Sequence, residues 1–242
     1  MESKKKKKIK TFKEFDPKKY VNTEPVIKEA KSDTVVFSFG RMNPPTIGHE
    51  KLANKLKSVA KANGADARLY MSHSHNKKKD PLDYKSKYMF ARKAFGDVVV
   101  RSDARQIFQV AAELEAMGYR NVIMVVGSDR VKEFETLLNK YNGKEYEFDS
   151  IKVVSAGERD ADAGGVEGMS GTKLRGLAVK GQFDDYTDEK GKKQYGFGSA
   201  APSKLSDKDK MTMMKLIQKN LSEKLEEALT AARTKLDSED AE

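Results

Sequence analysis

One segment of the chain combines residue types that bind phosphate groups in proteins. Its sequence, FGRMNPPTIGH over residues 39–49, follows directly after an apolar run. Gly40 lets the chain leave that run without a Cβ clash, and Gly48 would let the backbone approach a ligand closely. Thr46 and His49 are predicted at the start of a helix, where free N–H groups and the positive end of the helix dipole attract phosphate. We therefore expect a phosphate-binding loop here.

Two segments together resemble the signatures of a known enzyme superfamily. GRMNPPTIGH, over residues 40–49, looks like the first signature of the HxGH nucleotidylyltransferases, and MSGTKLR, over residues 169–175, matches their ISSTxxR or ISGTxxR box. They occur in the family's order, one after the first predicted strand and one at a predicted helix start after the fifth. The resemblance covers residues 33 to about 183.

The resemblance implies a nucleotidyl transfer reaction. Members of the superfamily join a nucleoside triphosphate to a phosphorylated acceptor, whose phosphate attacks the α-phosphate directly and displaces pyrophosphate. No covalent enzyme intermediate forms, so catalysis depends on positioning and on the stabilisation of charge. Mg²⁺ is implied as the cofactor, and it would bridge the phosphates with few protein ligands.

Individual roles follow from position in the two signatures. His49 would stabilise the α-phosphate, and Thr46, which replaces the first His of the pattern, would give a neutral hydrogen bond. Ser170 and Thr172 would offer hydroxyl and N–H groups to the β- and γ-phosphates, and Arg175 would clamp the leaving pyrophosphate. The positions implied as nucleotide-binding are Phe39, Gly40, Arg41, Met42, Asn43, Gly48, Gly171 and Thr172.

The second signature departs from its family pattern at Gly171. A glycine in place of Ser loses one hydroxyl, but it preserves access to the backbone N–H. Neither this change nor Thr46 in the first signature excludes activity.

The acceptor is indicated by two further segments. GSDR, over residues 127–130, resembles the Gly-x-Asp segment of pyridine-nucleotide branches, and NKKKDPL, over residues 76–82, resembles a loop of archaeal-type nicotinamide mononucleotide adenylyltransferases. Gly127, Asp129 and Lys77 are therefore candidate acceptor-binding residues. The leading pair of substrates is ATP with nicotinamide mononucleotide, a reaction of NAD biosynthesis.

Other interpretations stay open. A Ser-Asp pair at a helix start also serves as an N-cap, and a run of lysines is often only solvated. The same chemistry could use CTP with a phosphorylated alcohol, or ATP with phosphopantetheine or flavin mononucleotide. His73, His75 and Asp80 could suggest a metal site, but no fourth ligand or cysteine accompanies them, and we expect no metal held by a side-chain cluster.

Charge and composition narrow the class of protein. The 242 residues carry a net charge of +10, and Lys4 to Lys8 should form a solvated arm that could contact nucleic acid or another polyanion. A nucleic-acid-binding or assembly protein on an inactive nucleotidyltransferase fold is thus a further alternative.

The absence of cysteine excludes disulfides and cysteine nucleophiles and fits a reducing, cytoplasmic location. No apolar run is long enough to cross a bilayer, and no secretory signal is apparent at the N-terminus.

The elements expected around the motifs form an α/β domain. Short apolar runs alternate with helical patterns, which predicts a doubly wound, Rossmann-like parallel sheet of five strands with ligands beyond the strands' carboxyl ends. The predicted strands cover residues 34–39, 67–72, 97–101, 121–127 and 151–155.

The chain divides into four parts by composition. We expect a flexible basic tail over residues 1–32, a nucleotidyltransferase domain over 33–183, a linker over 184–205, and a C-terminal helix with an acidic end over 206–242. In that helix an apolar stripe keeps to one face, which favours a nearly straight helix rather than a coiled coil. The stripe must pack on the main domain or on another subunit, so a homo-oligomer is one expectation. The stripe consists of Met214, Ile217, Leu221, Leu225, Ala228, Ala232 and Leu236.

Overall fold

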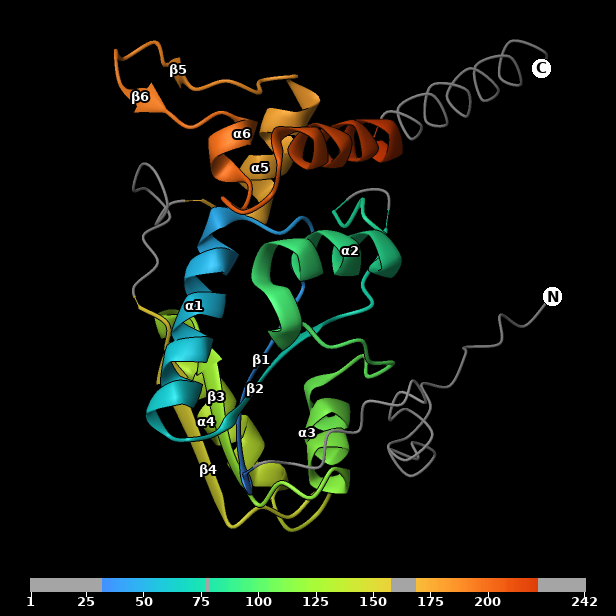
Figure 1. Cartoon of the computed structure of the whole chain (residues 1–242), viewed down its shortest axis with the longest axis vertical. Helices are drawn as coiled ribbons and strands as arrows, with labels where there is room; N and C mark the ends of the chain where they lie inside the picture. The colour runs from blue at the N-terminus through green and yellow to red at the C-terminus, as the bar shows by residue number, and fades with distance from the viewer. Residues whose placement is uncertain (1–31, 77–78, 158–168, 222–242) are drawn as a thin grey trace, which may run out of the picture.

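A parallel sheet lies at the centre of the protein (Figure 1). The computed structural model describes residues 32–76, 79–157 and 169–221. Within them the main sheet has four strands in the order β2-β1-β3-β4, which confirms the predicted parallel α/β architecture. The strands are β1 Thr34–Gly40, β2 Asp66–Met71, β3 Asn121–Val126 and β4 Ser150–Ser155.

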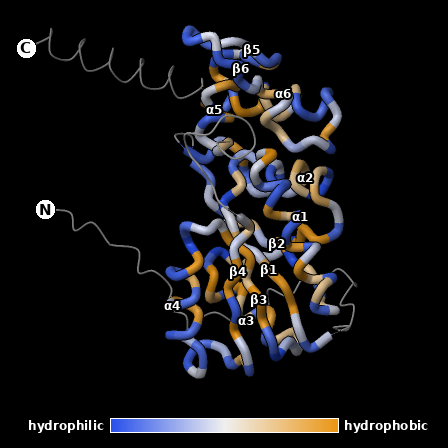
Figure 2. Tube along the Cα trace, turned by 90° about the vertical axis from the view of Figure 1, so that its left-hand side faces the viewer, coloured by the Kyte–Doolittle hydropathy of each residue, from blue (hydrophilic) through white to orange (hydrophobic). Residues whose placement is uncertain are grey.

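Helices cover both faces of the sheet because side chains alternate along each strand. Val36 and Ile123 belong to a core cluster shared with α1 and α2, whereas Val35 and Val122 belong to one shared with α3 and α4. Figure 2 shows hydrophobic residues concentrated along the strands between these helices. The helices are α1 Ile47–Ala62, α2 Tyr84–Phe95, α3 Ile107–Ala116, α4 Val131–Tyr141 and α5 Gly171–Val179.

The prediction of a strand over residues 97–101 is wrong. Gly96–Val98 forms the short 3-10 helix η3, and only Val99 makes a bridge, parallel to Leu69 of β2. The left-handed φ of +78° at Gly96 and the turn after it use up residues that an edge strand would need. The segment lies beside β2, but a single bridge does not add a fifth strand to the sheet.

The C-terminal region folds onto the sheet domain. Residues 184–205, expected as a loop, contain a two-stranded hairpin of β5 (Tyr186–Thr187) and β6 (Lys193–Gln194), followed by α6 (Phe197–Ala200). Residues 207–221 are helical, and Figure 1 shows this helix grouped with α5 and α6 at one end of the molecule.

The helix over residues 207–221 packs on the main domain, one of the two arrangements left open by the sequence. Met214 is 6% exposed and Ile217 is fully buried, and both share a core cluster with Leu174 of α5 and Phe90 of α2. The predicted stripe residues from Leu225 onward lie outside the described part of the chain. Within that part, no helix is both long and apolar enough to cross a membrane.

Candidate functional site

A cleft of about 830 Å³ opens beyond the carboxyl ends of the strands. Its walls include Phe39 from β1, Val126 from β3 and Ala156 directly after β4. Ligands of parallel α/β sheets bind at this edge, because the loops there are free to diverge while the strands hold them in place. The cleft contains all the residues predicted from the two signatures, namely Phe39, Gly40, Arg41, Met42, Asn43, Thr46, Gly48, His49, Ser170, Gly171, Thr172 and Arg175.

The two signatures meet through Arg175. Its Nη1 donates a hydrogen bond of 2.6 Å to the carbonyl oxygen of Asn43, 132 positions earlier in the chain. Its Nη2 donates one of 3.0 Å to the hydroxyl of Thr172, one turn before it on α5. Burial lowers the pKa of Arg175 below its ordinary value, although a guanidinium stays charged at neutral pH. A charged guanidinium thus stands between the two signatures.

Helix α1 begins with a reciprocal cap between Thr46 and His49. The Thr46 hydroxyl accepts a hydrogen bond from the His49 N–H at 3.3 Å, and the Thr46 N–H donates to Nδ1 of the His49 ring at 3.1 Å. Such a capping box usually has Glu or Gln at the third helical position, and here a histidine fills it. Because a backbone N–H can only donate, Nδ1 must be unprotonated, so a neutral His49 ring carries its proton on Nε2.

Helix α5 begins at the second signature. Ser170 is its N-cap, and the Ser170 hydroxyl accepts a hydrogen bond of 3.1 Å from the N–H of Lys173. This hydroxyl keeps its own proton for donation to a ligand, and the first-turn N–H groups have no partner within the helix. The predicted helix start is therefore confirmed, with its N-terminus at the cleft.

Gly171 is explained by the approach of α5 to the first loop. A Cβ at this position would lie 3.3 Å from the carbonyl oxygen of Asn43 and 3.3 Å from Nη1 of Arg175. Both separations are tighter than most contacts of real Cβ atoms. The glycine thus allows the hydrogen bond between Arg175 and Asn43 to form without displacement of either group.

The side chain of Asn43 does not reach toward a nucleotide. It is 3% exposed, and it donates to the carbonyl of Leu82 at 2.8 Å while it accepts from the N–H of Leu82 at 3.0 Å. Only its backbone carbonyl faces the second signature, where Arg175 binds it. Asn43 therefore connects the loop after β1 with the loop after β2.

Sequence reasoning missed Lys87, which strengthens that connection. Its Nζ donates to the carbonyl of Arg41 at 3.3 Å, of Ser72 at 2.6 Å and of Ser74 at 3.1 Å, and its side chain is fully buried. Burial lowers the pKa of Lys87 to about 8. A lysine on the apolar face of α2 was the signal that sequence offered.

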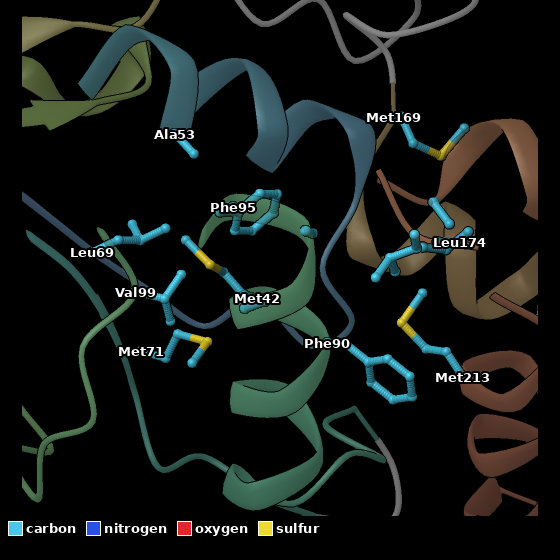
Figure 3. Packing of buried hydrophobic residues seen from close by; sticks show 14 of the residues in the cluster. Met42, Ala53, Leu69, Met71, Phe90, Phe95, Val99, Met169, Leu174 and Met213 are labelled. Atoms are coloured by element: carbon cyan, nitrogen blue, oxygen red, sulfur yellow. The ribbon is translucent and has the colours of Figure 1, made fainter. Parts of the chain in front are cut away.

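Met42 lines the cleft, but most of its side chain packs in the core. Its side chain is 2% exposed, and Figure 3 shows it among Leu69, Val99 and Phe95. Its φ of +45° lies in the left-handed region, which is uncommon for a residue with a Cβ. Burial of this side chain holds the turn that directs the loop backbone toward the cleft.

The cleft is electrostatically one-sided. Its charged lining residues within the described ranges are all basic, although the chain contains 37 acidic residues. Like charges in a shared cleft repel one another, and an anionic ligand would relieve that repulsion. The basic residues are Arg41, Lys51, Lys79, Arg130 and Arg175.

The other predicted positions fall into different places. Gly127 lines the cleft, Asp129 is not among its lining residues, and Lys77 lies outside the described part of the chain. Lys79, from the lysine run that could neutralise triphosphate charge, lines the cleft, and so does Arg130, to which the sequence assigned no role. Arg130 is paired with Glu133 at 2.9 Å and lies over the ring of Phe134.

His73 and Asp80 make contacts with other groups of the protein. His73 stacks on Tyr84 with ring centroids 3.8 Å apart, and its Nε2 lies 2.7 Å from the carbonyl of Ser102. Asp80 forms an ion pair with Arg41, in which Oδ1 lies 3.6 Å from Nη1. Over the described ranges, no three His, Asp or Glu side chains gather in a way that could hold a metal ion.

Comparison with known proteins adds no family assignment. The chain matches no model of a known protein family, and no characterised protein matches its sequence. The resemblance to the HxGH nucleotidylyltransferases therefore rests on the two sequence signatures alone.

Proposed function

We propose that this protein is a nucleotidyltransferase that transfers a nucleotidyl group from a nucleoside triphosphate to a phosphorylated acceptor and releases pyrophosphate. The observation that carries the proposal is the hydrogen bond from Arg175 to Asn43, because it joins two signatures that are 132 positions apart at one basic cleft. A fold with no polyphosphate to bind has no evident need for this convergence of a histidine, a guanidinium and two helix N-termini.

The groups at the cleft divide the triphosphate among them. Nε2–H of His49 is the donor for the α-phosphate, where negative charge develops as the acceptor oxygen attacks. The Ser170 and Thr172 hydroxyls and the first N–H groups of α5 hold the β- and γ-phosphates. Arg175 adds a permanent positive charge for the leaving pyrophosphate. The acceptor oxygen forms a bond to the α-phosphorus as the bond to the bridging oxygen breaks, so the electron pair leaves with pyrophosphate.

Mg²⁺ would enter with the triphosphate. The described lining of the cleft offers the hydroxyls of Ser38, Thr46, Ser170 and Thr172 but no carboxylate, so the phosphates would supply most of the ligands. Bound in this way, the ion would neutralise charge on the phosphate oxygens.

ATP and nicotinamide mononucleotide are the substrates that we favour. Gly127 lines the cleft, as expected for a residue near the acceptor, and Arg130 beside it could pair with the acceptor phosphate. The basic lining suits two phosphorylated substrates, since both must bring their charges into one cleft.

The proposal is tested by a matrix of four nucleoside triphosphates and four acceptors, read as pyrophosphate release with Mg²⁺ present. The acceptors are nicotinamide mononucleotide, phosphopantetheine, flavin mononucleotide and a phosphorylated alcohol. We expect release with ATP and nicotinamide mononucleotide, and loss of release in Arg175→Ala. Release with another pair alone would replace the substrates but keep the reaction class. No release from any pair, with no triphosphate binding, would refute the proposal.

A further inference from the structure

The residue directly after His49 is bound to the C-terminal region. Glu50 is 8% exposed, and one of its carboxylate oxygens accepts the N–H of Ser203 at 2.7 Å while the other accepts the Ser203 hydroxyl at 2.7 Å. The partners are 153 positions apart. Such paired, charge-assisted hydrogen bonds on a nearly buried carboxylate fix an orientation more strictly than a surface contact does.

The segment that holds Ser203 is anchored firmly enough to act on α1. Phe197, Ala200 and Ala201 before Ser203 are fully buried, and Leu205 after it is 3% exposed. These residues belong to the same core cluster as Leu56 of α1. The loop around Ser203 is therefore a rigid surface against which the first turn of α1 rests.

The same C-terminal region also reaches the cleft and its other wall. Leu221 lines the cleft, and the side-chain amide of Gln218 donates to the carbonyl of Ala178 on α5 at 2.7 Å. The amide of Asn220 donates to the carbonyl of Pro81, one residue before Leu82, which Asn43 binds. This region thus contacts α1, α5 and the loop after β2.

We propose that Glu50 is a positioning residue, through which the C-terminal region sets the orientation of the His49 ring. The Ser203 hydrogen bonds hold the carboxylate of Glu50, and through this side chain they restrain the neighbouring turn, in which Thr46 and His49 form the cap of α1. Loss of these bonds frees the turn to rotate or fray, and the hydrogen bond from the Thr46 N–H to Nδ1 weakens with it. Only the expected effect of Glu50 on turnover rests on the proposed function; the effect on the His49 ring does not.

The ring of His49 can be observed directly. The chain has three histidines, so long-range ¹H–¹⁵N correlation spectra of the full-length protein would resolve every ring, with His73 and His75 as internal references. Nδ1 and Nε2 give different ¹⁵N shifts when one of them carries the proton, and these shifts report the tautomer. This measurement requires no substrate and no activity.

Glu50→Ala should move the His49 nitrogen shifts toward those of a mixed tautomer and leave His73 unchanged. Glu50→Gln should resemble the unmodified protein, because its amide can still accept the Ser203 N–H and donate to the Ser203 hydroxyl. Ser203→Ala, which leaves the carboxylate in place, should move the shifts in the same direction by a smaller amount. If Glu50→Ala does not fold, Ser203→Ala carries the test.

The matched control is Asp209→Asn, which removes the ion pair between Asp209 and Lys93 of α2. It loosens the same C-terminal region at a different contact and should leave the His49 shifts unchanged. Unchanged His49 shifts in both Glu50→Ala and Ser203→Ala would overturn the inference. So would an equal shift in Glu50→Gln and Glu50→Ala, because charge rather than hydrogen bonding would then be responsible.

A kinetic measurement then separates positioning from simple loss of fold. Glu50→Ala should lower kcat about tenfold with little change in the KM for the triphosphate, and Glu50→Gln should restore most of it. A fall in the amount of folded protein at unchanged kcat per folded molecule would contradict a positioning role. If shifts move as expected but no variant has activity, the proposed function fails and the positioning of His49 stands.

Discussion

At the scale of single residues, His49 has two roles, one for each ring nitrogen, and a substitution can separate them. Its Nδ1 takes part in the cap of α1, and its Nε2 is the group that we assign to the α-phosphate. Glutamine is a common residue at this position of a capping box, because its side-chain oxygen also accepts the N–H of the cap residue. A glutamine substitution should therefore keep the first role and remove the second.

His49→Gln should lower turnover by about 10²-fold, the usual effect of removing a group that stabilises charge in the transition state. Its free energy of unfolding should stay within about 0.5 kcal/mol of the unmodified value. His49→Ala should show the same loss of turnover and a further loss of about 1 kcal/mol in stability, because the Thr46 N–H loses its hydrogen bond to the ring as well. Steady-state rates and urea unfolding measure the two effects. Turnover near the original value in His49→Gln would remove His49 from the reaction.

Glu113 is a buried carboxyl group that lies away from the cleft. It is 2% exposed on α3 and accepts a hydrogen bond from the Ser102 hydroxyl. Burial raises its pKa from 4.5 to about 7. Between these two pH values the folded state holds a proton that the unfolded state has released, so stability decreases as the pH rises through this window.

Glu113→Gln should remove that dependence, since an amide resembles the protonated acid and does not titrate. The difference in unfolding free energy, variant minus unmodified protein, should increase by up to about 3 kcal/mol between pH 4.5 and pH 8. Urea unfolding over this range measures it. A difference that is constant with pH, or that decreases, would show that the carboxyl group titrates normally in the folded protein.

At the scale of elements, the site depends on how closely the N-terminus of α5 approaches the loop after β1. Asn43 and Lys87 connect that loop to the loop after β2. The Asn43 side chain donates to the carbonyl of Ser74, and Lys87 donates to the carbonyl groups of Arg41 and Ser72. Gly171 then lets α5 pack against the Asn43 carbonyl. The approach is therefore sensitive to the volume of the side chain at position 171.

Gly171→Ala should weaken binding of Mg·ATP only slightly, because its Cβ needs a shift of a few tenths of an ångström. Gly171→Val should weaken binding about tenfold or more, since its two methyl groups must displace Arg175 from the Asn43 carbonyl. Titration calorimetry gives the two affinities, and circular dichroism checks that helix content is kept. Equal affinities for Gly171→Val and the unmodified protein would show that this approach does not matter for binding.

Sequence patterns predicted most of these elements, but they did not predict which side chains of the first loop are buried. Buried runs predicted β1 and β3 closely, because parallel strands covered on both faces are continuously apolar. The run at residues 97–101 looked similar, yet Gly96 turns the chain and leaves one bridge. In the first loop, the resemblance to the first signature implied that Asn43 and Met42 line the cleft, but it could not show that both side chains are buried. Lys87 was missed because a lysine on the apolar face of a predicted helix does not show which backbone carbonyl groups its Nζ will reach.

At the scale of the whole molecule, the C-terminal helix and the sheet domain share one core. Met213 from residues 207–221 lies near Leu174 of α5 and Phe90 of α2 in Figure 3. The apolar stripe in the sequence predicted a packed face, but a stripe carries no information on what covers it. Two-state unfolding of the described domain is expected, because the buried residues of 207–221 belong to the same core cluster as the sheet domain.

Ile217→Ala should lower the free energy of unfolding by about 2–5 kcal/mol, the cost of a cavity at a fully buried position. Lys215→Ala, at an exposed position of the same helix, is the control and should change it by less than about 0.5 kcal/mol. Both should unfold in one transition seen by circular dichroism and tyrosine fluorescence together. A separate early transition in Ile217→Ala would show that the helix folds independently of the sheet domain.

The most direct test of the convergent cleft is the binding of Mg·ATP, measured by titration calorimetry on the full-length protein and on Arg175→Ala. We predict one bound equivalent and a loss of affinity of at least about tenfold in the variant, or about 1.4 kcal/mol. Arg120→Ala is the control and should bind like the unmodified protein. It removes an arginine that pairs with Asp149 at the amino ends of β3 and β4, away from the cleft. No binding of any nucleoside triphosphate, or equal affinity in all three proteins, would contradict the account.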